Sequence, residues 1–223
     1  MKIKYWFIFA SIIFVILSIV SLSCKKDDEN QIIVKGSITD PKTGSGIAGC
    51  SLYLDGKVLS SGIYNDNFSE IASATTDGSG LFEIKTDWQV VSQYRIRAFK
   101  LNYFENSSLV SAESIPKGGT YSTTINISPV AWVRLNVTNI VGFNSDDEIQ
   151  YKFASTPQTC YDCCSNQFII GDGATYSSTL KCKVIGNRYN KFYWTVRRDG
   201  ITNPFSDSIF CPSFDTTVKV IAY

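Results

Sequence analysis

The sequence predicts an all-β protein that consists of two consecutive β-sandwich domains behind an N-terminal signal segment. Short stretches rich in Val, Ile, Thr, Tyr and Phe recur along the chain, and Gly, Asn, Asp and Pro divide them, which is typical of strands joined by turns. Apolar residues do not recur with the 3.6-residue period of a helix over the length of a helix. The chain after residue 30 is long enough for two domains of about one hundred residues each.

The composition excludes several classes of function. Among its 223 residues the chain has no histidine, so a Ser-His-Asp triad, a Cys-His pair and a His-ligated zinc site cannot form. The 21 Lys and Arg residues nearly balance the 20 Asp and Glu residues, which argues against a nucleic-acid partner.

One route to catalysis needs no histidine, namely the pair of carboxylates that glycosidases use. The acidic residues of the second half lie in turn-rich sequence, where Asp is common, and we expect these to be solvated: Asp146, Asp147, Glu148 and Asp172. We therefore predict that the protein is not an enzyme and has no catalytic residues, no metal site and no cofactor.

The first 23 residues have the anatomy of a signal peptide. Two lysines precede an apolar stretch of sixteen residues, 5–20, that only two serines interrupt, and this is shorter than the ~20 residues of a membrane-spanning helix. Small residues and then Cys24 follow, which resembles the lipobox of bacterial lipoproteins, although Ser21 stands where an aliphatic residue is more usual. The resemblance implies removal of residues 1–23 and acylation, for instance with palmitate, of Cys24. An uncleaved anchor and an ordinary secretory signal are the alternatives.

Residues 24–30 form the expected lipidated tether. After Cys24 the sequence reads Lys-Lys-Asp-Asp-Glu-Asn, a charge run typical of a solvated linker. It also resembles the export signal of surface lipoproteins in Bacteroidota-type outer membranes. This resemblance implies a protein anchored in the outer membrane through acyl chains on Cys24 and exposed at the cell surface.

Residues 31–128 are the predicted first sandwich. In the strand Gln31 to Thr39, Val34 and Ile38 share one face, and in a later strand Phe82 and Ile84 point inward. The dipeptide Asp55-Gly56 predicts a tight turn. Cys50, the one cysteine of this half, is expected to be a small buried apolar residue.

This half resembles the carboxypeptidase regulatory-like domain. Three elements in the right order carry the resemblance: Val34-Lys35-Gly36 with Thr43-Gly44 and Ile47-Ala48-Gly49, the hairpin Thr76-Asp77-Gly78-Ser79-Gly80-Leu81-Phe82, and the strand from Tyr94 to Ala98 that leads to Asn102-Tyr103-Phe104. The resemblance implies a seven-stranded prealbumin-like sandwich that acts as a non-catalytic module, and it names no ligand.

Residues 129–223 are the predicted second sandwich, which resembles no family that we recognise. The strands Ala131 to Asn139 and Glu148 to Phe153 alternate between apolar and polar residues, and Asp199-Gly200 is a hairpin signal. About seven strands in this length suggest an immunoglobulin-like sandwich that contains several cysteines.

Five cysteines lie in the second half: Cys160, Cys163, Cys164, Cys182 and Cys211. An exported protein sits where disulfides form, and we expect the loop that contains the first three to be linked to Cys182 and Cys211. Two alternatives remain open. The five residues could stay reduced thiols, or the C-x2-C pair at 160 and 163 could begin a zinc site.

Two aromatic residues are candidates for stacking on a ligand. Trp132 shares a strand face with Arg134 and Asn136, and Tyr193 alternates with Phe192 and Trp194. Flat aromatics beside polar donors suit a glycan, although packing between sheets or at a domain junction is the more common role of such residues and the favoured one here. We therefore predict an accessory or adhesion module for a glycan or protein partner. The alternatives are a structural component of the outer-membrane surface without a small ligand and, last, a glycosidase.

Overall fold

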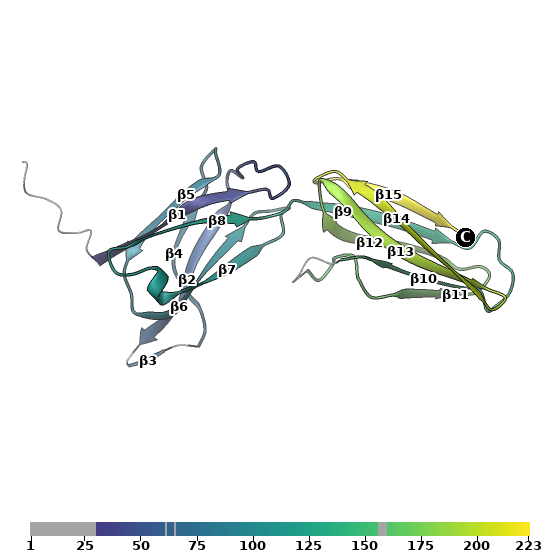
Figure 1. Ribbon diagram of the computed structural model, residues 1–223, viewed down its shortest axis with the longest axis horizontal. Helices are drawn as coiled ribbons and strands as arrows, with labels where there is room; N and C mark the ends of the chain where they lie inside the picture. Colours follow the sequence, from purple (N-terminus) through teal and green to yellow (C-terminus); the bar gives the residue numbers. More distant parts are fainter. Residues whose placement is uncertain (1–29, 61, 65, 156–159) are drawn as a thin grey trace, which may run out of the picture.

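The computed structural model describes residues 30–60, 62–64, 66–155 and 160–223, and it contains two β-sandwiches that follow one another along the long axis of the molecule (Figure 1). The prediction of an all-β protein with two consecutive sandwiches is confirmed. The signal peptide and Cys24 lie outside the described residues. In the part of the chain that is described, no helix has the length and hydropathy of a membrane span.

The first sandwich packs a three-stranded sheet against a larger one. The smaller sheet contains, in spatial order, β5 (Leu81–Asp87), β1 (Gln31–Thr39) and β8 (Thr120–Asn126). The larger sheet contains β4 (Ser69–Thr75), β2 (Ser51–Ser60), β6 (Val91–Phe99) and β7 (Asn106–Ser111), with the two-residue β3 (Ile63–Tyr64) also beside β2. A short 3-10 helix, η2 (Ala112–Ser114), follows β7.

Alternation explains the core of this sandwich. Val34 and Ile38 of β1 and Phe82 and Ile84 of β5 are buried as predicted, because successive side chains of a strand point to opposite faces. Each such side chain contributes about 1.5–3 kcal/mol when it leaves water. Cys50 is fully buried in the same cluster, as expected.

The predicted turn at Asp55-Gly56 is wrong. Strand β2 runs through both residues to Ser60, and its register against the neighbouring strands shifts next to Leu54 and again after Gly56. These irregularities are β-bulges, which bend a strand without ending it. The Asp55 side chain is buried on the outer side of the sheet, where two arginines of β6 bind it.

The second sandwich also has a three-stranded and a four-stranded sheet. The first contains β12 (Ser177–Ile185), β9 (Val130–Thr138) and β15 (Thr216–Ala222). The second contains β11 (Ile169–Asp172), β10 (Glu148–Phe153), β13 (Arg188–Arg198) and β14 (Ile201–Cys211). The predicted hairpin between β13 and β14 is confirmed, and both of its turn residues have positive φ, 47° at Asp199 and 74° at Gly200.

The core of the second sandwich contains the residues that alternation predicts. They are Val133, Leu135 and Val137 of β9 and Ile149, Tyr151 and Phe153 of β10. Phe192 of β13 packs against this set, with its ring centroid 5.8 Å from that of Phe153.

The two sandwiches have the same strand connectivity. When β3 is left aside, the first strand of each sandwich pairs antiparallel with the fourth and parallel with the seventh. The second strand pairs with the third and the fifth, and the fifth pairs with the sixth. The sequence did not indicate this repetition.

Backbone and ring contacts join the sandwiches. The N–H of Val130 donates to the carbonyl of Asn102 at 2.8 Å, and the N–H of Phe104 donates to the carbonyl of Ser128 at 2.9 Å. The ring of Tyr103 lies against that of Phe214, with 5.3 Å between centroids. The turn between β6 and β7 of the first sandwich therefore packs directly on the second.

Candidate functional site

The two aromatic residues singled out in the sequence do not lie on one surface. Trp132 is half-buried on the outer face of the sheet that contains β9, because its neighbour Val133 points into the core. Tyr193 is half-buried on the outer face of the opposite sheet, because Phe192 points into the same core. The amine of Lys191 lies 5.0 Å from the centroid of the Tyr193 ring. The two residues therefore face away from each other and cannot form one stacking surface.

The cysteines form two disulfides. Cys160 is bonded to Cys163, and Cys164 is bonded to Cys182, with Cα–Cα distances of 5.4 and 4.8 Å. The expected link between the loop and Cys182 is confirmed. These bonds leave no thiolate at the C-x2-C pair for a zinc ion.

The expected link to Cys211 is wrong. Because Cys160 bonds within its own loop, only Cys164 reaches out of the loop, and Cys182 takes it. The thiol of Cys211 is free and fully buried at the end of β14, in the sheet that faces β12. This burial raises the pKa of the Cys211 thiol.

Loop 160–164 lies along strand β12. Cys163 pairs with Lys183 in a parallel β-bridge, and the N–H of Lys183 donates to the carbonyl of Asp162 at 2.9 Å. The amine of Lys183 also forms a 2.8 Å ion pair with the carboxylate of Asp162, and the hydrogen bond lowers the pKa of Asp162. Two disulfides and these bonds hold the loop, and Tyr161 projects from it fully exposed.

A buried carboxylate organises the outer face of the first sandwich opposite that loop. Asp55, 1% exposed, accepts hydrogen bonds from Nε of Arg97 at 2.6 Å and from Nε of Arg95 at 2.9 Å. Burial by itself would raise the pKa of the Asp55 carboxyl, but the hydrogen bonds from Arg97 and Arg95 outweigh it and lower the pKa. The guanidinium groups also lie over aromatic rings, Arg95 4.4 Å from the Phe68 centroid and Arg97 4.8 Å from that of Tyr53.

A cleft of about 430 Å³ lies between this face and the disulfide loop; we call it the inter-sandwich cleft. The first sandwich contributes Arg95, Arg97, Tyr103, Phe104 and Glu105 to its lining. The second contributes Tyr161, Asp162 and Lys183. Its volume falls in the range of small-molecule sites, about 300–1,000 Å³.

The chemistry of the cleft suits binding. It offers charged donors, carboxylate acceptors and three aromatic rings. A glycosidase needs one carboxyl group with a raised pKa to act as the general acid, whereas the pKa values of Asp55 and Asp162 are both lowered. Among the residues that the structure describes, no group of three or more His, Cys, Asp or Glu side chains could hold a metal ion.

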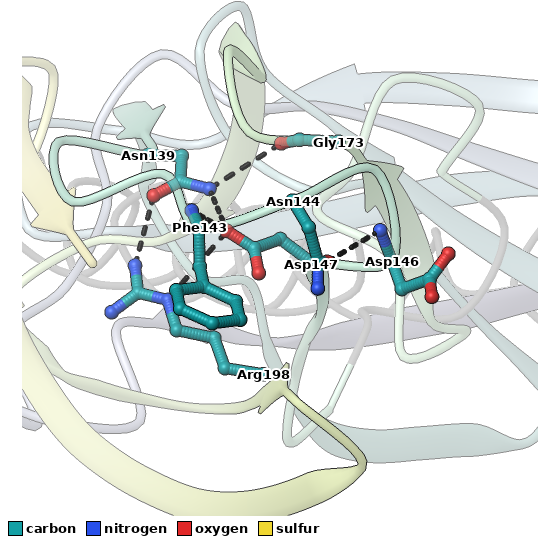
Figure 2. A network of polar contacts seen from close by, with 7 residues as sticks. All are labelled: Asn139, Phe143, Asn144, Asp146, Asp147, Gly173 and Arg198. Atoms are coloured by element: carbon teal, nitrogen blue, oxygen red, sulfur yellow. Dashed lines mark hydrogen bonds and ion pairs between the residues drawn. The ribbon is translucent and has the colours of Figure 1, made fainter.

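Asp147 is the centre of a second polar network and is not the solvated turn residue that was expected (Figure 2). Its Oδ2 accepts hydrogen bonds from the N–H of Phe143 and from Nδ2 of Asn139, both at 2.9 Å, and lies 3.8 Å from Nε of Arg198. Nη2 of Arg198 donates to Oδ1 of Asn139 at 2.8 Å. The N–H of Phe143, followed by Asn139, lowers the pKa of Asp147.

This network holds the loop between β9 and β10, residues 139–147, in one shape. The loop exposes three apolar side chains, Ile140, Val141 and Phe143, which are 65%, 62% and 68% exposed. It lies at the end of the long axis that is opposite to the start of β1 (Figure 1). We call it the apical loop.

The comparisons with known proteins give no family. No family matches the sequence, and no curated protein resembles it. Among solved structures, the Bacillus anthracis TIE protein is similar over 86% of this chain with 11% identity and a TM-score of 0.37, and the chain spans about a third (34%) of that protein.

Two pilins are similar to the chain at comparable levels. The shaft pilin SpaA from Lactobacillus rhamnosus GG matches 86% of this chain and 97% of its own, with 7% identity and a TM-score of 0.32. The minor pilin GBS52 of Streptococcus agalactiae matches 85% of this chain and 94% of its own, with 12% identity and a TM-score of 0.31. At these identities and TM-scores, the matches give no information about function. The fold and the site together define a two-sandwich β-protein with a cleft between its sandwiches.

Proposed function

We propose that the protein is a lipid-anchored, non-catalytic accessory or adhesion module of the outer-membrane surface, which binds its partner in the inter-sandwich cleft. The lipobox-like sequence before Cys24 and the Lys-then-acidic run after it support the anchor and the surface location. The two disulfides support an extracytoplasmic compartment, because such bonds persist in oxidising environments.

The observation that carries the proposal is the cleft itself. Side chains from β6 and from loop 160–164, which is distant from β6 in the chain, converge on it. Both walls are preformed, since Asp55 fixes the arginines of one wall and the disulfides fix the loop of the other. A site that is held before the ligand arrives loses less conformational entropy on binding.

The anchor is tested by labelling the full chain with palmitate in a Gram-negative host. Cys24→Ala should abolish both the label and recovery in the outer-membrane fraction. Cys50→Ala is the matched control, since Cys50 is a buried free thiol, and it should keep both. Protease treatment of intact cells should cleave the wild-type chain. An unlabelled wild-type chain, or one protected from protease on intact cells, would contradict the proposal.

A structural component of the surface, assembled through protein contacts, is the second candidate, and the apical loop favours it. Three exposed apolar side chains on one ordered loop are an unusual feature of an unpartnered surface. Under this alternative, Phe143→Ser should disperse complexes that gel filtration detects for the detergent-purified chain. Phe168→Ser, at another exposed phenylalanine, should leave them intact. A monomeric wild-type chain would rule the alternative out.

A further inference from the structure

The charges around the inter-sandwich cleft cancel. Arg95 and Arg97 share the carboxylate of Asp55, and Lys183 is paired with Asp162. The remaining positive charge faces Glu105, whose field acts on Arg97. An anionic ligand such as a phosphate, a nucleic acid or an acidic lipid therefore gains no net attraction from this cleft.

The arginines of the cleft have hydrogen-bond donors that their bonds to Asp55 do not use. A guanidinium has five N–H donors, and Asp55 engages the Nε and Nη2 atoms of both arginines, which leaves the Nη1 amino group of each outside these ion pairs. The exposed carboxylate of Glu105 on the same wall can accept. Donors and acceptors that alternate at close quarters match a ligand rich in hydroxyl groups, because each hydroxyl both donates and accepts.

Aromatic rings flank these polar groups on both walls. Tyr161 stands fully exposed on the disulfide-bound loop, and Tyr103 and Phe104 lie on the wall of the first sandwich. The negative face of an aromatic ring attracts weakly positive C–H groups, which a pyranose ring presents on one side while its hydroxyls point outward. The residues predicted from the sequence, Trp132 and Tyr193, lie outside this arrangement.

The pocket at the edge between β14 and β15 is a weaker candidate for such a ligand. It measures about 250 Å³ and is lined by Trp194, Phe205 and Tyr223, among others. The Trp194 ring is already stacked between Phe192 and Phe205, with centroid distances of 5.4 Å to each. Its two faces are therefore occupied by the protein.

We infer that the inter-sandwich cleft binds a neutral oligosaccharide, which stacks on Tyr161 and forms hydrogen bonds with the arginine pair and Glu105. This inference rests on the proposal that the cleft is the partner-binding site, and it names the ligand class. The disulfide Cys160–Cys163 then has a role in binding, since it closes the short loop that presents Tyr161.

The test is a printed array of neutral, uronic-acid and sialylated oligosaccharides, probed with the full chain purified in detergent. Neutral oligosaccharides should bind, and Tyr161→Ala should weaken their binding about tenfold. Tyr189→Ala is the matched control, because Tyr189 is 71% exposed on β13 and outside the cleft; it should change the affinity less than about twofold. Near-UV circular dichroism and an intact mass with two disulfides establish that each variant is folded.

Every other result overturns the inference. A blank array, or binding of acidic oligosaccharides alone, refutes the ligand class, and an equal loss in both tyrosine variants refutes the site. Palmitate labelling of the same chain distinguishes a failure of the oligosaccharide inference from a failure of the proposed anchored surface function. A blank array with a labelled, surface-exposed chain refutes the ligand alone, whereas binding by an unlabelled chain refutes the anchored surface role alone.

Discussion

The two sandwiches share one connectivity but bury a carboxylate in different places and with different partners. In the first sandwich, Asp55 lies within strand β2, and its partners are two charged guanidinium groups of the neighbouring strand. In the second, Asp147 lies just before β10, and its shortest hydrogen bonds come from a neutral backbone N–H and a side-chain amide.

The difference shows that two sandwiches with the same connectivity can use a buried carboxylate to hold different parts of the structure. A carboxylate within a strand fixes the outer face of a sheet, and in this protein that face becomes one wall of a cleft. A carboxylate at the end of a loop fixes the loop, and in this protein the loop presents apolar side chains at an end of the molecule. The same kind of group therefore builds a polar site in one half and an apolar surface in the other.

The largest expected effect is a loss of stability in the second sandwich when its disulfides are removed. Among the described residues, only this sandwich has disulfides. Replacing Cys164 and Cys182 together by Ala should lower the free energy of unfolding of the second sandwich by about 3 kcal/mol, and replacing Cys160 and Cys163 by about 2 kcal/mol, because the longer closed loop restricts the unfolded chain more. Denaturant titration of the full chain measures both. A first sandwich that loses equal stability would contradict this assignment.

The next effect concerns the first sandwich alone. Asp55→Ala leaves two arginines without their common partner, and we expect a loss of about 2–3 kcal/mol, below the value for fully buried pairs because both arginines are about 30% exposed. The same denaturant titration measures it. Asp87→Ala, at an exposed position in β5, should cost less than about 0.5 kcal/mol. Equal losses in the two variants would show that the ion pairs contribute nothing specific.

Acid should destabilise both sandwiches through these carboxyl groups. The pKa values of Asp55 and Asp147 are lowered in the folded chain, so the stability they contribute is complete above the unfolded value of about 3.9 and is lost as the pH falls through their folded pKa. Thermal melts between pH 7 and pH 2 should show this decline. Asp55→Asn should reduce the decline of the first sandwich only, and Asp147→Asn should reduce that of the second only. If neither variant changes the decline, other groups cause it.

The smallest expected effect concerns the outer faces of the second sandwich. Trp132→Ala and Tyr193→Ala remove half-buried rings that lie outside the cleft on opposite faces. We expect a change of less than about twofold in oligosaccharide binding, measured on the same array as Tyr161→Ala. A loss of binding in either variant would move the site from the cleft to that face.

The alternation of apolar and polar residues along the chain allowed much of the fold to be predicted. It failed where polar residues occupy a strand. The inward faces of β1, β5, β9 and β10 follow directly from their apolar residues. Strand β7 was missed because its sequence, Asn-Ser-Ser-Leu-Val-Ser, has two adjacent apolar residues and no alternation. Asp55-Gly56 has the composition of a turn, but both residues pair with β4 and β6, and two arginines 40 and 42 residues later bind the Asp55 side chain.

The candidate site was less predictable, because its parts are far apart in the chain. Asp147 is buried and forms an ion pair with Arg198, 51 residues later, and nothing in the local sequence Asn-Ser-Asp-Asp indicates that contact. The cleft joins residues near 100 to residues near 160 and 183. One local signal was available, since an aromatic residue between Cys160 and Cys163 would project from any short loop that this pair closes.

The parallel pairing of the first and last strands has a consequence for length. Because β1 and β8 run in the same direction side by side, as do β9 and β15, the polypeptide enters each unit at one pole and leaves it at the other. Each sandwich therefore moves the chain forward by the length of one sandwich. A further unit of this kind would extend the molecule along its long axis without turning the chain back, so the length of a protein of this design would scale with the number of its units.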